Sequence, residues 1–294
     1  GSALAIEEIF TEAGFPAHVF RALVIGVPPV ERVIRDPRVR GVTLTGSERA
    51  GRAVGGVAGA VIKPSVLELG GADPFIVLED ADLALACEQG AVSRLINNGQ
   101  SCIAAKRFIV EDAVHDDFVD GLRAALERRV MGDPRDEQTD IGPQARGDLR
   151  DELHGQVTRT LAAGAALVTG GAIPEGPGYY YPATMLTGVA PGMAAFDEEV
   201  FGPVAPVIRA RDAAHAVALA NQSDLGLGAS LWTQDLDRAL HNVPRIESGH
   251  VAVNGIVKSD PRLPFGGIKN SGYGRELSRH GILEFVNTRT VWIK

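Results

Sequence analysis

The sequence predicts an α/β fold whose sheet is mostly parallel. Short apolar segments alternate with amphipathic or small-residue segments from the first residue onward, which is typical of a parallel sheet with helices packed on it. The chain has 294 residues and is 45% hydrophobic, so it can bury a substantial core and has room for about two domains. No run of 18 apolar residues interrupts this pattern, so no membrane span is expected.

The helices are predicted from their side-chain spacing and from their end signals. The first spans residues 2–13 and ends at Gly14, with Pro16 beyond it, a usual helix stop. Asp82 is expected to begin the helix that leads toward Cys102. The other helices are expected at residues 29–35, 47–60, 83–97, 113–129, 144–163, 212–221, 235–244 and 275–285.

Apolar runs bounded by turn residues predict the strands. They are expected at residues 21–25, 39–44, 66–68, 74–78, 107–111, 204–209, 229–233 and 250–254, and an extended segment is expected to open at 179–182. Residues 287–293 form one more predicted strand at the end of the chain. An isolated strand needs a partner, because its backbone groups are otherwise unpaired.

The composition argues against several classes of protein. A net charge of −8 without a block of basic residues is untypical of nucleic-acid binding. Residues 1–8 predict a helix rather than a signal peptide, and two cysteines do not make a disulfide framework, so a reducing cytoplasm is expected. No Cys/His cluster has the spacing of metal ligands, so no metal is expected.

Cys102 is the first candidate for chemistry. It follows a predicted helix and lies in a small polar loop, Asn-Asn-Gly-Gln-Ser-Cys at 97–102, before an apolar strand. A thiol held there by backbone can ionise and attack an electrophile. The alternative is a small hydrophobic residue in a helix–strand connection. Cys87 lies in mid-helix among Ala and Leu and is interpreted as inert packing.

Glu68 is the second candidate. It stands between two leucines at the end of an apolar strand, just before Gly70 and Gly71. Burial there would raise the pKa of its carboxyl group, which suits a general base near neutral pH. The alternative is a glutamate that points to water while its neighbours point inward, since side chains alternate along a strand.

The turn at Gly46 and Ser47 joins a strand end to a helix N-terminus. Backbone N–H groups at such a place can bind a phosphate. The turn lacks the G-x-G-x-x-G pattern of dinucleotide sites, so a plain helix cap at Ser47 is the alternative.

Four segments together resemble the signature motifs of the NAD(P)-dependent aldehyde dehydrogenase superfamily. In the family's order they are Leu-Glu-Leu-Gly-Gly at 67–71, Gly-Gln-Ser-Cys at 99–102, Glu-Glu-Val-Phe-Gly-Pro-Val at 198–204 and Pro-Phe-Gly-Gly-Ile-Lys-Asn-Ser-Gly at 264–272. The resemblance implies the C-terminal part of that fold. It comprises a partial Rossmann-like cofactor-binding domain at 1–70, a catalytic thiol domain at 71–270, and a C-terminal helix and oligomerisation strand at 271–294. A homo-oligomer, dimer or tetramer, is implied by the terminal strand.

The resemblance also implies a mechanism. Cys102 attacks an aldehyde, NAD or NADP accepts the hydride, and Glu68 activates the water that hydrolyses the resulting thioester. The cofactor-binding residues that carry over are Gly46, Ser47, Leu69, Glu199 and Phe201.

The segments 259–267 and 271–278 resemble those of succinate-semialdehyde dehydrogenases. A carboxylate-bearing substrate is best bound by a cation or by hydroxyl donors. The implied substrate-binding residues are therefore Ser259, Arg262 and Phe265, with a small-molecule aldehyde as the only partner besides further copies of the chain.

Two functional hypotheses follow, because the family pattern includes roughly another third of chain ahead of residue 1. The chain is either the C-terminal part of an active aldehyde dehydrogenase, or a truncated fragment without activity of its own. In the second case it would serve as an oligomerising or scaffold piece, or would need a partner chain.

Overall fold

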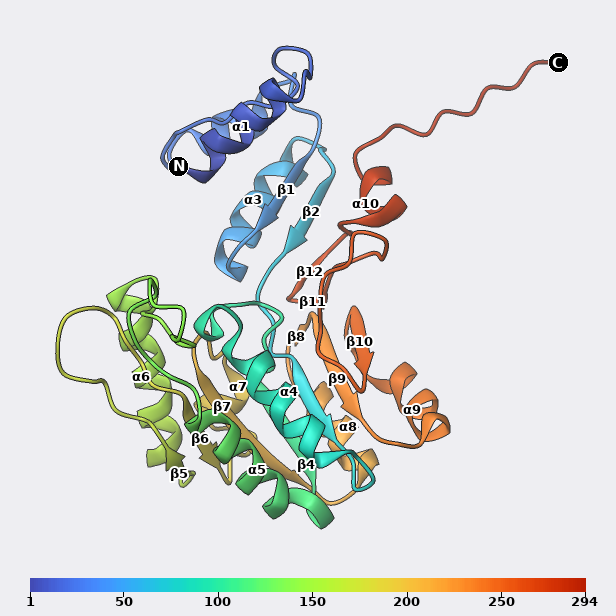
Figure 1. Cartoon of the computed structure of the whole chain (residues 1–294). Helices are drawn as coiled ribbons and strands as arrows, with labels where there is room; N and C mark the ends of the chain where they lie inside the picture. Colours follow the sequence, from blue (N-terminus) through green and yellow to red (C-terminus); the bar gives the residue numbers. More distant parts are fainter.

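The computed structural model describes residues 1–294, and it confirms the predicted α/β fold. The chain forms a small sheet, in the order β1-β2-β12, and a large seven-stranded sheet, in the order β10-β9-β3-β4-β7-β6-β5. A third, minor pairing joins β11 (Ile268–Lys269) to β8 (Leu225–Gly226). The small sheet lies above the large one (Figure 1).

The small sheet is a short parallel unit closed by a C-terminal segment. β1 (Val42–Thr45) runs parallel to β2 (Ser65–Glu68), and α3 (Glu48–Ala60) connects the two. β12 (Gly272–Tyr273) pairs antiparallel with β2, with Gly272 opposite Glu68. Two segments about 200 residues apart in the sequence therefore meet at the strand that carries Glu68.

The large sheet is parallel except for its edge strand β5. Its strands are β3 (Pro74–Val77), β4 (Arg107–Glu111), β5 (Ala166–Thr169), β6 (Thr184–Thr187), β7 (Val204–Ala210), β9 (Gly228–Trp232) and β10 (His250–Val253). β3 shows why both faces are buried: Phe75 and Val77 join one core, while Ile76 and Leu78 join the other. Side chains alternate across the sheet, so a continuous apolar run needs cover on both sides.

Helices supply that cover. α4 (Leu83–Leu95) and α5 (His115–Glu127) pack on one face (Figure 1), and α6 (Gly147–Ala162), α7 (Ala194–Asp197), α8 (Ala213–Asn221) and α9 (Leu236–Asn242) contribute to the core of the other. The remaining helices are α1 (Ser2–Glu12), α2 (Val30–Arg35) and α10 (Ser278–Leu283), with short 3-10 turns η1 (Ile96–Gly99), η2 (Asp112–Val114) and η3 (Val243–Arg245). No helix is long and apolar enough to cross a membrane.

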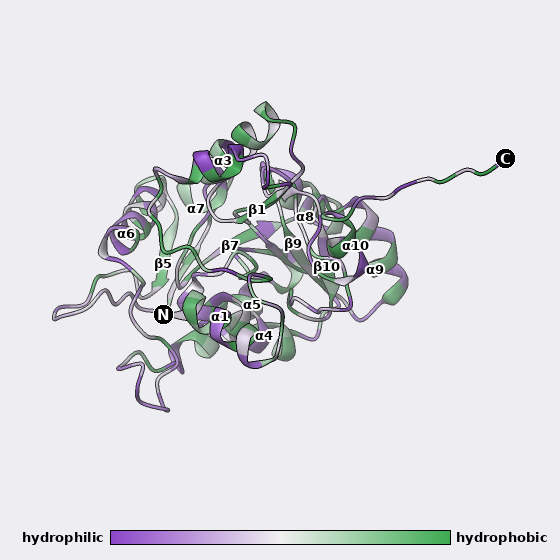
Figure 2. Ribbon diagram, turned by 90° about the horizontal axis from the view of Figure 1, so that it is seen from above, coloured by the Kyte–Doolittle hydropathy of each residue, from purple (hydrophilic) through white to green (hydrophobic).

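Two predicted strands are not formed. Residues 21–25 and 287–293 make no strand pairs; Val24 is 81% exposed and Trp292 is 87% exposed. A strand depends on a neighbour to pair its backbone, and neither segment has one in the chain. The residues after α10 extend away from the body in two perpendicular views (Figures 1 and 2).

Helix α10 is also shorter than the predicted 275–285, and the edge strand β5 was not predicted. Leu277, which precedes α10, has a φ value of +61°, outside the right-handed helical region, so the helix begins only after this residue. β5 is a four-residue edge strand with one strand neighbour, and two of its residues are exposed and two half-buried.

Arg107, at the start of β4, is a buried tie between the large sheet and α8. Its guanidinium donates to the carbonyl oxygens of Ala72 (2.9 Å), Leu219 (3.1 Å) and Ala220 (2.8 Å). Burial lowers the pKa of Arg107 to about 10, so the group stays charged at neutral pH. The two last carbonyls belong to the C-terminal turn of α8, where a cation is favoured.

Replacement of Arg107 by methionine is expected to lower the free energy of unfolding by about 3–5 kcal/mol, because three buried carbonyls lose a charged donor. Arg209→Met is the control, since Arg209 forms its ion pairs with Asp112 and Asp116 at the surface. That change should cost only about 0–1 kcal/mol. Urea unfolding of both variants measures the difference, and equal losses would contradict the assigned role of Arg107.

Candidate active site

A cavity of about 830 Å³ lies where the small sheet meets the large one. It draws its lining from four parts of the chain: the β1–α3 turn, the segment after β2, the loop before β4, and α6 with the segment after α7. The lining residues are Thr45, Gly46, Ser47, Leu69, Gly70, Gln100, Ser101, Cys102, Leu149, Glu152, Leu153, Gln156, Glu198, Glu199 and Phe201. The structure thus brings together Cys102 and all five predicted cofactor-binding residues.

The loop that carries Cys102 has an unusual backbone. Asn97, Asn98 and Gly99 have successive φ values of +49°, +57° and +76°. Asparagine and glycine tolerate this left-handed conformation best. Gly99 also packs directly on the backbone of Gly202, where a Cβ atom would overlap. The sequence Asn-Asn-Gly is therefore what ends α4 and turns the chain into the cavity.

Side chains of the same loop fasten it to residues 142–145. Asn98 accepts from the N–H of Gly142 (2.9 Å) and donates to the carbonyl of Pro143 (3.2 Å). Gln100 accepts from the N–H of Ala145 through its side-chain oxygen (2.8 Å). These bonds hold the loop from outside the sheet, so the position of Cys102 does not depend on its own side chain.

Cys102 is half-buried, and its surroundings keep the thiol protonated. Burial, followed by the carboxylates of Asp73, Glu199 and Glu68, raises the pKa of Cys102, and the Lys106 ammonium opposes the rise. Burial and these carboxylates therefore favour the neutral thiol over the thiolate. Attack on an electrophile requires that a base first remove the proton.

Glu68 is buried, which favours the base interpretation over the solvent-facing one. Only 3% of the residue is exposed, and neither carboxylate oxygen makes a hydrogen bond within the protein. Burial and then the Glu276 carboxylate raise the pKa of Glu68 to about 7, although the nearby Gly267 N–H and Arg275 guanidinium lower it in part. A carboxyl group with this pKa can accept a proton at neutral pH.

Glu68 does not itself line the cavity. Its strand position pairs with Thr45 on one side and Gly272 on the other, and its Oε1 would lie 2.8 Å from a Cβ atom on Gly266. Its charge is still close enough to raise the pKa of Cys102. Proton transfer between the two therefore requires rotation of the Glu68 side chain or a bridging water.

Glu199 faces the cavity, while its neighbour Glu198 points to α6. Gln156 donates to Glu198 Oε2 (3.0 Å) and to the carbonyl of Glu199 (3.1 Å), and Arg159 donates to both oxygens of Glu198. The carboxylate of Glu199 accepts from the N–H of Gly71 (3.0 Å) and remains partly exposed. This leaves an acceptor in the cavity wall that could bind a ligand hydroxyl.

The N-terminus of α3 opens into the same cavity. Ser47 caps it by accepting from the N–H of Ala50 (3.3 Å), and Gly46 and Ser47 both line the cavity. Ser47 is thus a helix cap, as the alternative interpretation predicted. This cap does not exclude anion binding, because the 13-residue α3 presents its positive end to the cavity. The residues present fit a group with a phosphate and a hydroxyl.

The predicted substrate-binding residues lie elsewhere. Ser259 and Arg262 are exposed, and Arg262 is paired with Asp260 at 2.6 Å. Phe265 is buried and forms an isolated bridge with Glu276. None of the three lines the large cavity.

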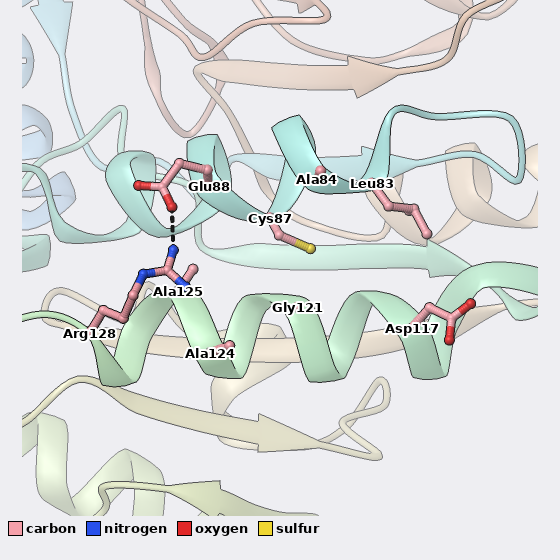
Figure 3. A pocket seen from close by; sticks show the side chains of 9 residues that line it. All are labelled: Leu83, Ala84, Cys87, Glu88, Asp117, Gly121, Ala124, Ala125 and Arg128. Atoms are coloured by element: carbon pink, nitrogen blue, oxygen red, sulfur yellow. Dashed lines mark hydrogen bonds and ion pairs between the residues drawn. The ribbon is translucent and has the colours of Figure 1, made fainter.

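A second cavity, of about 360 Å³, lies between α4 and α5 (Figure 3). Cys87 reaches into it toward Gly121, and burial raises the pKa of its thiol to about 12. Both cysteines are free. Only Cys102 has the exposure that a nucleophile needs. No group of three or more His, Cys, Asp or Glu side chains is placed to hold a metal ion.

The large cavity therefore joins a cysteine loop to a helix N-terminus and lies beside a buried glutamate. The chain belongs to the aldehyde dehydrogenase family, whose sequence profile matches residues 1–291.

Its relatives include succinate-semialdehyde dehydrogenases. It is 50% identical over 292 residues to the succinate-semialdehyde dehydrogenase [NADP(+)] 1 of Mycobacterium ulcerans, covering 99% of this chain and 64% of the relative. It is 51% identical to the succinate semialdehyde dehydrogenase [NAD(P)+] of Escherichia coli K12, of which it covers 63%. The crystal structure of a Streptococcus pyogenes succinic semialdehyde dehydrogenase in complex with NADP+ matches with a TM-score of 0.96, 39% identity and 64% coverage of that chain. The chain thus spans less than two thirds of the length of these relatives.

Proposed function

We propose that this chain oxidises an aldehyde to the carboxylic acid with NAD or NADP, through a thioester on Cys102, and that the aldehyde is succinate semialdehyde. The observation that carries the proposal is the shared cavity: the Cys102 thiol, the N-terminus of α3 and the partly exposed Glu199 carboxylate line the same space of about 830 Å³. This volume is within the range of about 300–1,000 Å³ that small-molecule sites occupy.

The residues of the chain have distinct parts in this reaction. Cys102 Sγ loses its proton to Glu68 and bonds to the aldehyde carbon, giving a hemithioacetal. The N–H of Cys102 makes no hydrogen bond within the protein and can donate to the new oxyanion. A nicotinamide cofactor held by Gly46, Ser47 and Glu199 would supply the hydride acceptor for this site, and Cys102 would then hold the oxidised carbon as a thioester. Glu68 releases the thiol proton to solvent, and its carboxylate then takes a proton from a water that attacks the thioester carbon. The tetrahedral intermediate collapses to the carboxylic acid, and Cys102 leaves as the thiolate.

The cofactor-binding roles follow from the chemistry of the lining. The α3 N-terminus at Gly46 and Ser47 would bind the pyrophosphate, Glu199 would accept from a ribose hydroxyl, and Phe201 and Leu69 would supply apolar contact. We further propose the division into residues 1–70, 71–270 and 271–294, and an oligomer formed through the C-terminal segment, in a cytoplasmic setting.

The choice of succinate semialdehyde rests on the names of the relatives and on the C-terminal motifs. A role for Ser259 and Arg262 would require the exposed loop that carries them to fold over the cavity. Arg262 would then have to exchange Asp260 for the substrate carboxylate, and Phe265 would support the loop from beneath.

The alternative, an oligomerising piece without activity of its own, is favoured by the exposed apolar residues Val291, Trp292 and Ile293. Calorimetric titration with NAD and with NADP, combined with an assay of succinate semialdehyde oxidation, distinguishes the two. We expect binding with a Kd between about 1 μM and 1 mM, and turnover that exceeds that of an aldehyde of equal length without the carboxylate. Absence of both binding and turnover would favour the alternative.

A further inference from the structure

Lys106 occupies a position that none of the family motifs marks. It directly precedes β4 and is only 1% exposed, although its side chain carries an ammonium group. Its Nζ donates to the carbonyl oxygens of Ser101 (2.9 Å) and Cys102 (2.7 Å). It also lies 3.3 Å from Glu199 Oε1 and 6.0 Å from the centre of the Phe201 ring. One buried cation therefore contacts the nucleophile loop and two of the proposed cofactor-binding residues.

These contacts form a closed ring. Lys106 binds the carbonyl of Cys102 and the carboxylate of Glu199, and Glu199 accepts from the N–H of Gly71. Gly71 in turn packs against the Cys102 carbonyl, where a Cβ atom would approach the oxygen to 2.5 Å. A Cβ atom on Gly70 would overlap Glu199 Oε2. The contacts among Lys106, Glu199 and the Cys102 carbonyl thus explain the glycines at positions 70 and 71, because a larger residue at either position would collide with this group.

Further charges face Lys106 from the surrounding elements. Asp73 is fully buried beside it, and Arg94 donates to the carbonyl of Gly99 (2.8 Å) while two of its guanidinium nitrogens have no partner. Burial lowers the pKa of Lys106, and the carboxylates of Glu199 and Asp73 counteract that effect. A buried ion pair is weak support for stability, since apolar replacements often serve a core as well. Stability alone therefore does not explain why these charged side chains lie beside the Cys102 loop.

We propose that Lys106 is a positioning residue that ties the Cys102 loop to Glu199 and Phe201, so that the thiol and the cofactor-binding wall keep one geometry. The proposal rests on the function proposed above. Lys106 is not part of the cavity lining, and it acts through the peptide carbonyls at 101 and 102 and through the Glu199 carboxylate. It also places a positive charge beside the thiol.

The test measures the thiol directly, in the full chain and without cofactor. The rate of Cys102 alkylation by iodoacetamide is followed against pH, with the modified peptide identified by mass spectrometry. Lys106→Met should slow alkylation at pH 8 by about tenfold, which corresponds to an upward shift of one pH unit in the titration of the thiol. Glu199→Gln should have the opposite effect on the alkylation rate and raise it about threefold, because it removes a negative charge near the thiol.

Lys63→Met is the matched control. Lys63 is also partly buried and donates to two backbone carbonyls, those of Ile34 and Asp36, but lies outside the cavity lining. It should leave the alkylation profile unchanged. If Lys106→Met does not fold, as judged by circular dichroism, Lys106→Gln and Glu199→Gln carry the test.

The proposal would be overturned if Cys102 in Lys106→Met or Lys106→Gln were alkylated at a rate within twofold of the wild-type rate at every pH, even if the variant were less stable. Nucleotide titration gives a second readout: Lys106→Met should weaken binding about tenfold, since Glu199 and Phe201 lose their common support. A wild-type chain that turns over no aldehyde but still shows these alkylation shifts would disprove the proposed function and leave the Lys106 tie intact.

Discussion

Replacement of Cys102 by alanine is expected to abolish aldehyde oxidation, with a loss of at least about 10⁴-fold in kcat, because deletion of the nucleophile removes the covalent route altogether. The effect on the fold should be small. Cys102 is half-buried, and the loop is held by Asn98, Gln100 and Lys106 rather than by the thiol. Nucleotide binding should therefore persist in the variant, and calorimetry checks this beside the activity assay.

Cys87→Ala is the matched control for Cys102→Ala. Cys87 lies between α4 and α5 and points toward Gly121 (Figure 3). Its thiol donates to the carbonyl of Phe118, and it is not among the residues that line the large cavity. Its loss should reduce stability slightly and leave kcat within about twofold. If Cys102→Ala retained a tenth of the activity, or if Cys87→Ala abolished it, Cys102 would not be the nucleophile.

The sequence alone predicts the part of the site that short motifs encode. Cys102 lies in a loop whose Asn-Asn-Gly backbone is indicated by the residue types. Glu68 stands out as a charge between two leucines, and the family motif around it favours a base over a glutamate that faces water. Six of the predicted site residues, namely Cys102 and the five cofactor-binding ones, line one cavity, because parallel strands end at a common edge where connecting loops converge.

Other parts of the site lack such a signal. Leu149, Leu153 and Gln156 come from α6, whose contribution depends on how that helix packs rather than on its local pattern. Lys106 is equally hidden, since a lysine before a strand is usually a solvent-exposed side chain. The burial of its neighbour Arg107 is equally hidden in the sequence. Both residues are buried cations, and their burial is explained only by the carbonyl oxygens that they contact in the folded chain.

The failed strand predictions have a related cause. Residues 22–25 form an apolar run, Ala-Leu-Val-Ile, of the same length as β3, yet β3 has β4 and β9 beside it and this run has no strand partner. Apolar patterning describes a side-chain face, whereas strand formation needs a backbone partner that the segment itself does not specify.

Glu68→Gln is the second change with a large expected effect. Glutamine keeps the shape of the side chain but cannot accept the proton of the thiol or of the attacking water, so kcat should fall by about 10²–10⁴-fold. The wild-type rate should rise with pH through the pKa of Glu68, about 7, because only the carboxylate is a base. In Glu68→Gln this inflection should vanish. A variant that kept both the rate and the inflection would assign the base to another group.

The same pKa gives a stability test with a definite sign. A glutamate carboxyl group in the unfolded chain has an ordinary pKa of 4.5, and the folded state raises it to about 7, so the folded protein binds more protons than the unfolded chain between these values. The free energy of unfolding contributed by Glu68 therefore falls as pH rises from about 4.5 to 7, the reverse of an ion-paired carboxylate. Urea unfolding of wild type and Glu68→Gln across this window should show the variant gaining relative stability with pH.

Glu276→Gln removes the second cause of the raised pKa of Glu68, so it should move the activity inflection to lower pH while retaining the base. An unmoved inflection would mean that burial alone sets the pKa of Glu68.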